Sequence, residues 1–152
     1  MKHPWFYIGM FFSLIFLVIL SLGGGIWGES VTLTHWTGEM FRGVCHQNPE
    51  RSFYVKGAYM AVNTRCFGIF AGLLAGWILI PVFVFRNIKN NWSLWVLLFA
   101  VIVQIIDYSG NLFQVWENTN VSRFYLGMFL GIVTSLSISD QFKPKKNKSN
   151  YE

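Results

Sequence analysis

Residues 66–85 read CFGIFAGLLAGWILIPVFVF and contain no charged side chain. A helix needs about 20 consecutive apolar residues to cross the hydrocarbon core of a bilayer, so this segment predicts a transmembrane helix over about 66–86. Pro81 is compatible with such a helix and predicts a kink near its end. Residues 5–22, WFYIGMFFSLIFLVILSL, are also apolar and free of charge. They predict an earlier span over about 5–27.

Two later segments reach the length of a membrane span only if each includes one ionisable residue. The apolar run at 93–106 becomes long enough by continuing through Asp107, and the last run contains Arg123 near its start. We therefore expect spans at about 93–113 and 121–139. The sequence predicts an all-α membrane protein with about four transmembrane helices.

The composition supports a membrane protein and argues against one that binds nucleic acid. Hydrophobic residues make up 53% of the 152 residues and charged residues 12%, against roughly a quarter charged in an average soluble domain. The formal net charge is +5, but a third of the basic residues are lysines of the C-terminal tail. We interpret that tail as a topology signal. The length allows one polytopic membrane domain over 1–142, followed by a basic tail over 143–152.

Lysine and arginine residues near the span ends favour one orientation. Four spans place both termini on one side, together with Lys2, Arg86, Lys89 and the tail lysines. Cytoplasmic flanks carry the excess of Lys and Arg, so we expect a multi-pass protein of the cell's inner (plasma) membrane with both termini in the cytoplasm. A cleaved signal peptide is the alternative reading of the first span. Its apolar run exceeds the usual roughly 7–15 residues.

The same arrangement gathers the unusual polar residues at the opposite face. That face holds the long connection 28–65 and the short connection 114–120. Asp107 lies late in the third span and Arg123 early in the fourth, so both approach that face. The second span starts there with residues 65–66. This convergence is the same whichever side is cytoplasmic, because reversing the protein moves all of these residues together.

The long connection carries a helical pattern of apolar residues. Spacings of three, four, seven and eight residues are typical of one helix face, and they separate Leu33, Trp36, Met40, Phe41 and Val44. We expect an interfacial helix over about 32–46, lying on the bilayer surface or folded over the bundle. Its end would deliver Cys45 and His46 to that surface. The alternative is a disordered polar loop, which the aromatic density of the segment argues against.

Glycines spaced four apart recur in two of the predicted spans. They are Gly68, Gly72 and Gly76 in the second span and Gly127 and Gly131 in the fourth. Small residues at this spacing let helix backbones approach closely in lipid. The pattern predicts that these two spans contact each other, or that one of them contacts a second copy in a homo-oligomer or a partner membrane subunit.

Cys45, His46 and Cys66 lead to several hypotheses about one site. Thiolate and imidazole are common ligands of zinc and other transition metals. Alternatively, the two cysteines form a disulfide, which an extracytoplasmic position permits, or one is a reactive thiol. The remaining reading is two unpaired structural cysteines beside an interfacial histidine. Three further side chains would be able to complete a tetrahedral metal site: His35, Glu50 and Asp107.

Arginines at the bilayer surface indicate either a structural ion pair or an anion site. Charges inside a span are costly and are normally paired, so we expect Asp107 to pair with Arg65 or Arg123. Guanidinium groups also bind phosphate and carboxylate in a bidentate geometry, and lipid headgroups are the nearest such ligands. Six residues are the candidates for ligand binding: Gln47, Arg51, Arg65, Asp107, Asn118 and Arg123.

Two motifs carry a resemblance to a known family. The chain reads CHQNPERSF at 45–53 and RCFGIFAG at 65–72, and it resembles the small prokaryotic membrane proteins grouped as domain of unknown function 2085. The family pattern has CHQxPERSF, then a CxxC, then an Asp in a later span and an Asn and an Arg before a glycine-rich last span. The resemblance implies a shared membrane architecture and a shared polar face, but no activity.

One departure from the family pattern concerns the metal hypothesis. Where the pattern has the first cysteine of its CxxC, this chain has Asn63. A side-chain amide binds zinc poorly. If the family pattern is a metal site, this chain therefore lacks one of its thiolates.

Two classes of function fit these observations. One is a non-enzymatic membrane protein whose polar face binds a metal, a lipid headgroup or a partner subunit, and it is the class we favour. The other is a small membrane enzyme acting on a lipid or isoprenoid phosphate, with the arginines holding the anion. The chain contains no HExxH, GxSxG, P-loop or dinucleotide-binding fingerprint that would indicate a particular reaction.

Overall fold

Four long helices dominate the structure, a computed structural model that describes residues 4–23, 26, 31–85 and 93–142. Each helix is long and apolar enough to cross a membrane. This confirms the predicted all-α membrane fold with four spans. The helices are α1 (Pro4–Leu22), α4 (Thr64–Phe85), α5 (Ser93–Leu112) and α6 (Asn120–Ile138). The predicted basic tail, 143–152, lies outside the described residues.

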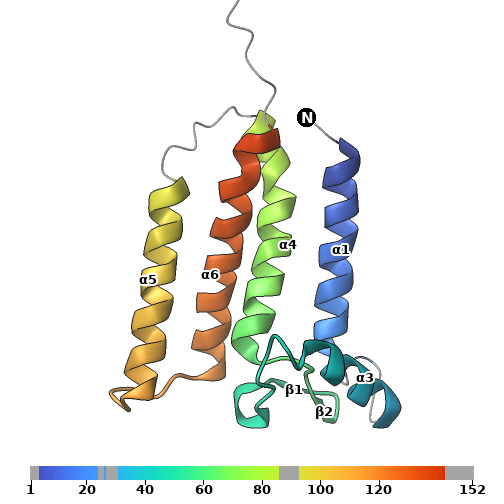
Figure 1. The fold of residues 1–152 in the computed structure, drawn as a ribbon, viewed down its shortest axis with the longest axis vertical. Helices are drawn as coiled ribbons and strands as arrows, with labels where there is room; N and C mark the ends of the chain where they lie inside the picture. The colour runs from blue at the N-terminus through green and yellow to red at the C-terminus, as the bar shows by residue number, and fades with distance from the viewer. Residues whose placement is uncertain (1–3, 24–25, 27–30, 86–92, 143–152) are drawn as a thin grey trace, which may run out of the picture.

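The four helices stand side by side in the order α5, α6, α4, α1 (Figure 1). The start of α1 and the end of α6 lie at one end of the bundle. The connection between α1 and α4 lies at the other end and contains the short helix α3 (Val31–Phe41). Apolar side chains remain exposed along all four long helices, as expected for surfaces that face lipid.

Helices α4 and α6 pack with their backbones in direct contact. A Cβ atom added to Gly72 would overlap the backbone of Met128, and one added to Gly131 would overlap the carbonyl oxygen of Ile69. The Ser135 hydroxyl also donates a hydrogen bond of 2.8 Å to the carbonyl of Leu73 across this seam. The glycine pattern therefore identified a real contact, between the second and fourth spans of one chain.

Near the start of α1, away from the connection, aromatic residues attach this helix to α4. The Tyr7 hydroxyl donates to the carbonyl of Trp77, and the Trp77 indole donates to the carbonyl of Tyr7, each at 3.1 Å. The two rings stack with centroids 5.5 Å apart. This reciprocal pair satisfies both polar atoms without water, which lets aromatic residues hold two helices together inside a membrane.

Helix α3 ends at Phe41, so the prediction of a helix continuing to residue 46 was wrong at its end. The Gln47 amide donates to the carbonyl of Gly38, one of the carbonyls that a helix end leaves without a partner, and also to the carbonyl of Ala61 at 3.0 Å. Gln47 itself has a φ of +49°. The chain therefore turns back over α3, and Cys45 leaves the helix and becomes buried.

The first span is also shorter than the expected 5–27, because α1 ends at Leu22. Gly23 follows with a φ of +45°, a left-handed conformation that terminates many helices. Its position is tight, since an added Cβ would lie 2.8 Å from the Cβ of Ala61. The end of α1 therefore rests directly on the chain segment that leads into α4.

A small β-hairpin in the connection was not predicted from the sequence. Strand β1 (Tyr54–Val55) pairs with β2 (Ala58–Tyr59) in antiparallel register. The turn between them has positive φ at both Lys56 (+48°) and Gly57 (+89°), as a two-residue hairpin turn requires. The signal was the glycine between two short aromatic-containing runs. It is weak because each strand has only two residues.

Candidate functional site

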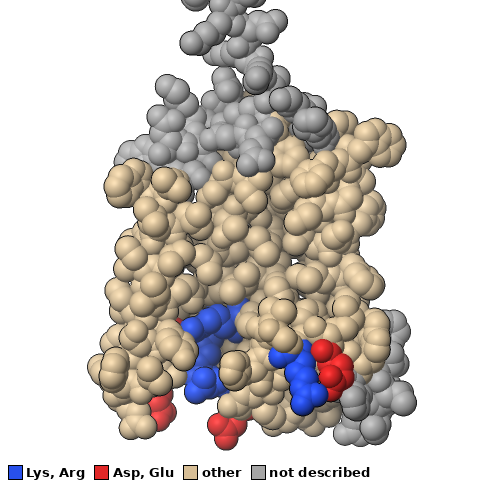
Figure 2. Space-filling view, in the orientation of Figure 1, with Lys and Arg blue, Asp and Glu red and all other residues tan. Residues whose placement is uncertain are grey.

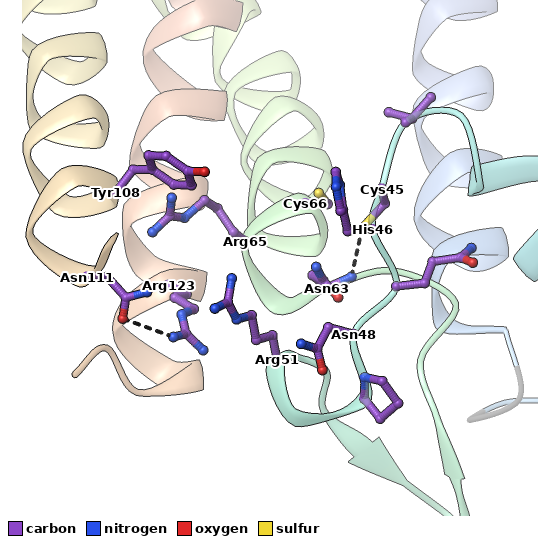
Figure 3. A pocket seen from close by; sticks show the side chains of 13 residues that line it. Cys45, His46, Asn48, Arg51, Asn63, Arg65, Cys66, Tyr108, Asn111 and Arg123 are labelled. Atoms are coloured by element: carbon purple, nitrogen blue, oxygen red, sulfur yellow. Dashed lines mark hydrogen bonds between the residues drawn. The ribbon is translucent and has the colours of Figure 1, made fainter. Parts of the chain in front are cut away.

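A cavity of about 640 Å³ opens at the end of the bundle that carries the connection. It lies where residues of this connection face the first turn of α4 and the neighbouring ends of α5 and α6 (Figure 3). Among the described residues on its wall are three arginines and no carboxylate. Ten of the residues that line it are labelled in Figure 3: Cys45, His46, Asn48, Arg51, Asn63, Arg65, Cys66, Tyr108, Asn111 and Arg123. In the space-filling view, basic side chains line the hollow at this end (Figure 2).

Arg65, in the first turn of α4, is paired with Asp107 of α5. One guanidinium nitrogen contacts Oδ2 of Asp107, and the Asn118 amide donates to Oδ1 at 2.7 Å. Asp107 is therefore engaged on both oxygens and buried behind the cavity wall. The Nε of Arg65 is buried without a hydrogen-bond partner among the described residues. This pair confirms that Asp107 has an arginine partner and shows that it is Arg65.

Arg123, near the start of α6, has only neutral partners in the described part of the chain. Its guanidinium donates to Oδ1 of Asn120 at 3.3 Å and to Oδ1 of Asn111 at 3.5 Å. The positive charges of Arg51 and Arg65 both act on it, opposed by Asp107. Three arginines and one carboxylate therefore leave a net positive charge in this cluster.

Arg51 is held by its backbone, while its side chain makes no hydrogen bond or ion pair with any residue the structure describes. It ends a short 3₁₀ turn (Pro49–Arg51) that Asn48 caps by accepting from the N–H of Glu50 at 3.0 Å. The Thr64 hydroxyl donates to the Arg51 carbonyl at 3.1 Å. The Asn120 amide donates to the carbonyl of Glu50 at 3.2 Å. The sequence NPER thus fixes at the cavity a guanidinium that has no partner among the described residues.

Cys45 and Cys66 form the opposite wall of the cavity. The two cysteines are free, and Cys66 packs against the buried cluster that contains Cys45, where its thiol acts on the Cys45 sulfur. The N–H of Asn63 also donates to the Cys45 sulfur at 3.2 Å. The hydrogen bond from Cys66 lowers the pKa of the Cys45 thiol to about 6, against the opposing effect of burial, and backbone N–H donors and His46 assist. This environment favours the thiolate form of Cys45.

The geometry does not favour the predicted metal centre. Within the described ranges, no three side chains of His, Cys, Asp or Glu lie close enough to hold a metal ion. Asp107, proposed as a further ligand, is paired with Arg65. Asn63, which replaces the family cysteine, accepts a hydrogen bond of 3.2 Å from Ser52 through Oδ1. The side chain of His35 is outside what the structure describes.

The structure brings most of the predicted site residues to this one cavity. Arginines 51, 65 and 123, both cysteines and His46 line it, and Asp107 and Asn118 support Arg65 from behind. Gln47 lines it too, but its amide is occupied by backbone carbonyls. Tyr108 was not predicted. The clue in the sequence was that Tyr108 lies three residues before Asn111 and therefore on the same face of the helix.

The fold defines a polytopic membrane protein with a basic cavity at one end of its helices. The chain belongs to the family described as predicted membrane protein (DUF2085), whose model matches residues 45–137. The match begins at Cys45 and covers the cavity wall except Val44, α4, α5 and nearly all of α6. The family resemblance predicted from the two motifs is thereby confirmed.

Two archaeal relatives are similar to more than half of the chain. The uncharacterized protein MJ1492 of Methanocaldococcus jannaschii is 38% identical over 88 residues, which are 58% of this chain and 56% of that protein. An uncharacterized protein of Methanothermobacter thermautotrophicus is 38% identical over 96 residues, 60% of this chain and 81% of that protein. The chain thus spans little more than half of the first relative. No solved structure gives a significant match.

Proposed function

We propose that this protein is a membrane-embedded binding module for a phosphate-bearing anion, held by Arg51, Arg65 and Arg123. The observation that carries the proposal is the composition of the cavity wall, with three guanidinium groups and no carboxylate among its described residues. Guanidinium groups recognise phosphate through paired N–H donors, and their like charges repel one another until an anion neutralises them. A bound anion would remove that repulsion.

The internal ion pair does not cancel the positive charge at the cavity. Asp107 compensates one of the three arginines, and Arg51 and Arg123 keep only neutral partners or none in the described ranges. The Nε of Arg65 also lacks a hydrogen-bond partner among the described residues, but it is buried, so the spare donors for a ligand are chiefly those of Arg51. The site therefore has spare donors and spare charge at the same place.

The position of the cavity favours a lipid phosphate as the source of the anion. Arg65 and Arg123 lie in the first turns of α4 and α6, at the end of each span, where headgroups meet the protein. We further propose the plasma membrane and a cytoplasmic position of both termini, which puts the cavity on the extracytoplasmic side. A free phosphate has the same chemistry, so the experiment must separate the two sources.

The test is retention of anions by the purified protein in nanodiscs. We expect native mass spectrometry to show retained phosphatidylglycerol, and Arg51→Gln to lose it by about tenfold, because one charge-assisted hydrogen bond contributes roughly 1.5 kcal/mol. Arg42→Gln is the matched control. Arg42 is an exposed arginine outside the cavity wall that pairs with Glu39 at 3.0 Å, and its loss should leave retention unchanged.

Three outcomes separate the possibilities. Displacement of the lipid by inorganic phosphate alone would identify a free anion as the ligand. Equal retention by wild type and Arg51→Gln would refute the proposal. A lipid or isoprenoid phosphate that is consumed during incubation, rather than retained, would support the enzyme alternative.

A further inference from the structure

Two thiols from separate parts of the chain meet at the wall of the arginine cavity. Cys45 follows α3 in the connection, and Cys66 lies in the first turn of α4. Cys66 packs against the buried cluster that contains Cys45, and both side chains lie on the same side of the cavity (Figure 3). Both line the cavity, so a small solute reaches them from its interior. Anion binding by the arginines uses neither of them.

We propose that Cys45 and Cys66 are a reversible oxidation site, in which a peroxide entering the cavity converts the thiol pair into a disulfide. The bridge would tie the α3 connection to α4. The two cysteines lie beside His46 and Arg65 on the cavity wall. Forming the bridge would therefore change the shape of the cavity.

The surroundings of Cys45 suit it to be the attacking sulfur. Its sulfur accepts a hydrogen bond from the N–H of Asn63 at 3.2 Å, and Cys66 packs against the cluster that contains it. Donors of this kind stabilise the thiolate, which is the nucleophilic form. The residue is 5% exposed, so the oxidant must be small, and a peroxide fits a cavity of about 640 Å³.

The reaction balances with the peroxide as the oxidant. The Cys45 thiolate attacks one peroxide oxygen, the O–O bond breaks, and Cys45 becomes a sulfenic acid while hydroxide leaves. The Cys66 sulfur then attacks the Cys45 sulfur, the S–O bond breaks, and the sulfenic oxygen leaves as water with the Cys66 proton. The proton that Cys45 lost on ionisation neutralises the hydroxide, so overall two thiols and one hydrogen peroxide give one disulfide and two waters.

The local packing holds the two sulfurs in place for the second step. Cys45 belongs to a buried cluster with Phe41, Ala61 and Val62, and Cys66 packs against that cluster. The hydrogen bond from Asn63 fixes the backbone three residues before Cys66 directly over the Cys45 sulfur. The sulfenic acid would therefore form next to its resolving thiol, which favours bridging over further oxidation.

The test uses the wild-type chain in nanodiscs, treated with hydrogen peroxide and then with N-ethylmaleimide. We expect the untreated protein to take up two maleimides after denaturation. The peroxide-treated protein should take up none, weigh two hydrogen atoms less and yield a peptide linking Cys45 to Cys66. Reduction with a phosphine should restore both maleimide adducts. Cys66→Ala should instead accumulate higher oxides at Cys45.

The readouts distinguish this inference from the anion proposal. Two free thiols after peroxide treatment, sulfinic acid at Cys45 of the wild type, or a bridge only between two chains would each overturn it. Lipid retention by the reduced protein tests the arginine site separately. If that site exists, we expect the bridged form to retain lipid with an affinity changed by at least threefold. An unchanged affinity would refute the link to the cavity and leave the bridge itself standing.

Discussion

The α4–α6 seam and the arginine cavity lie about one helical turn apart on the same two helices, yet they are built on opposite principles. At the seam, glycines bring the backbones into direct contact and leave no space. At the cavity, Arg65 and Arg123 occupy the preceding turns, and three like charges surround an open volume. The contrast indicates that the seam supplies the rigidity needed to hold repelling charges near each other.

The largest effect should come from filling the seam. We expect Gly72→Leu to destabilise the protein by about 3 kcal/mol or more, because the added side chain overlaps the backbone of Met128 and separates the helices. Thermal unfolding in detergent measures this loss. The control is Gly9→Leu in α1, where nothing lies within 4 Å of an added Cβ. Equal stability of the two variants would show that the seam does not determine the fold.

The second effect tests the ion pair between Arg65 of α4 and Asp107 of α5. We expect Asp107→Asn to destabilise the protein by about 2 kcal/mol, less than for a fully buried pair because the Arg65 side chain is 24% exposed. The same change leaves Arg65 free, so anion retention should rise. Stability and native mass spectrometry are measured on the same preparation.

The double variant Arg65→Gln with Asp107→Asn separates charge from packing. It removes both partners and should recover part of the stability while losing the gain in retention. If Asp107→Asn is as stable as the wild type and retains no more anion, the pair contributes nothing to either property.

The comparison also explains how much the sequence predicted. The seam was one of the two contacts that the sequence predicted, because small residues at every fourth position let helix backbones approach closely in lipid, whether the partner is another span or a second copy. The gathering of Arg65, Asp107 and Arg123 followed from topology alone, because hydropathy fixes where each span begins and ends. These inferences needed no knowledge of side-chain positions.

Other features of the cavity depend on long-range contacts that the sequence pattern does not predict. The end of α3 depends on Gln47 reaching back to Gly38, nine residues away. The thiol pair depends on the same turn, because a helix extended to residue 46 would not bury Cys45 against Ala61 and Val62. Long-range side-chain contacts of this kind override local propensity, which is why the predicted helix was too long.

The third prediction concerns the pH dependence of the thiol wall. The pKa of Cys45 is lowered from 9.0 to about 6, so its alkylation rate should reach half its maximum near pH 6. The ionised thiol stabilises the folded state most fully above the unfolded pKa near 9, and this contribution is lost as the pH falls through about 6. Peptide mapping after timed iodoacetamide pulses assigns the rate to Cys45.

Removing the hydrogen-bond donor tests the cause of this shift. Cys66→Ala should move the midpoint of the Cys45 profile upward, because the largest stabilising contact of the thiolate is lost. An unchanged midpoint in Cys66→Ala would assign the shift to His46 or to the backbone donors instead.

The variant with the smallest expected effect on stability tests whether the anion is recognised by paired donors or only by positive charge. Arg123→Lys keeps the charge but loses the planar pair of donors that now contact Asn111 and Asn120 at 3.5 and 3.3 Å. These contacts are long and neutral, so unfolding should change by no more than about 0.5 kcal/mol. Retention of a lipid phosphate should nevertheless fall about threefold to tenfold. If Arg123→Lys retains lipid like the wild type, the cavity attracts anions by charge alone. The cavity would then depend on charge and not on side-chain geometry, whereas the α4–α6 seam depends on close backbone contact.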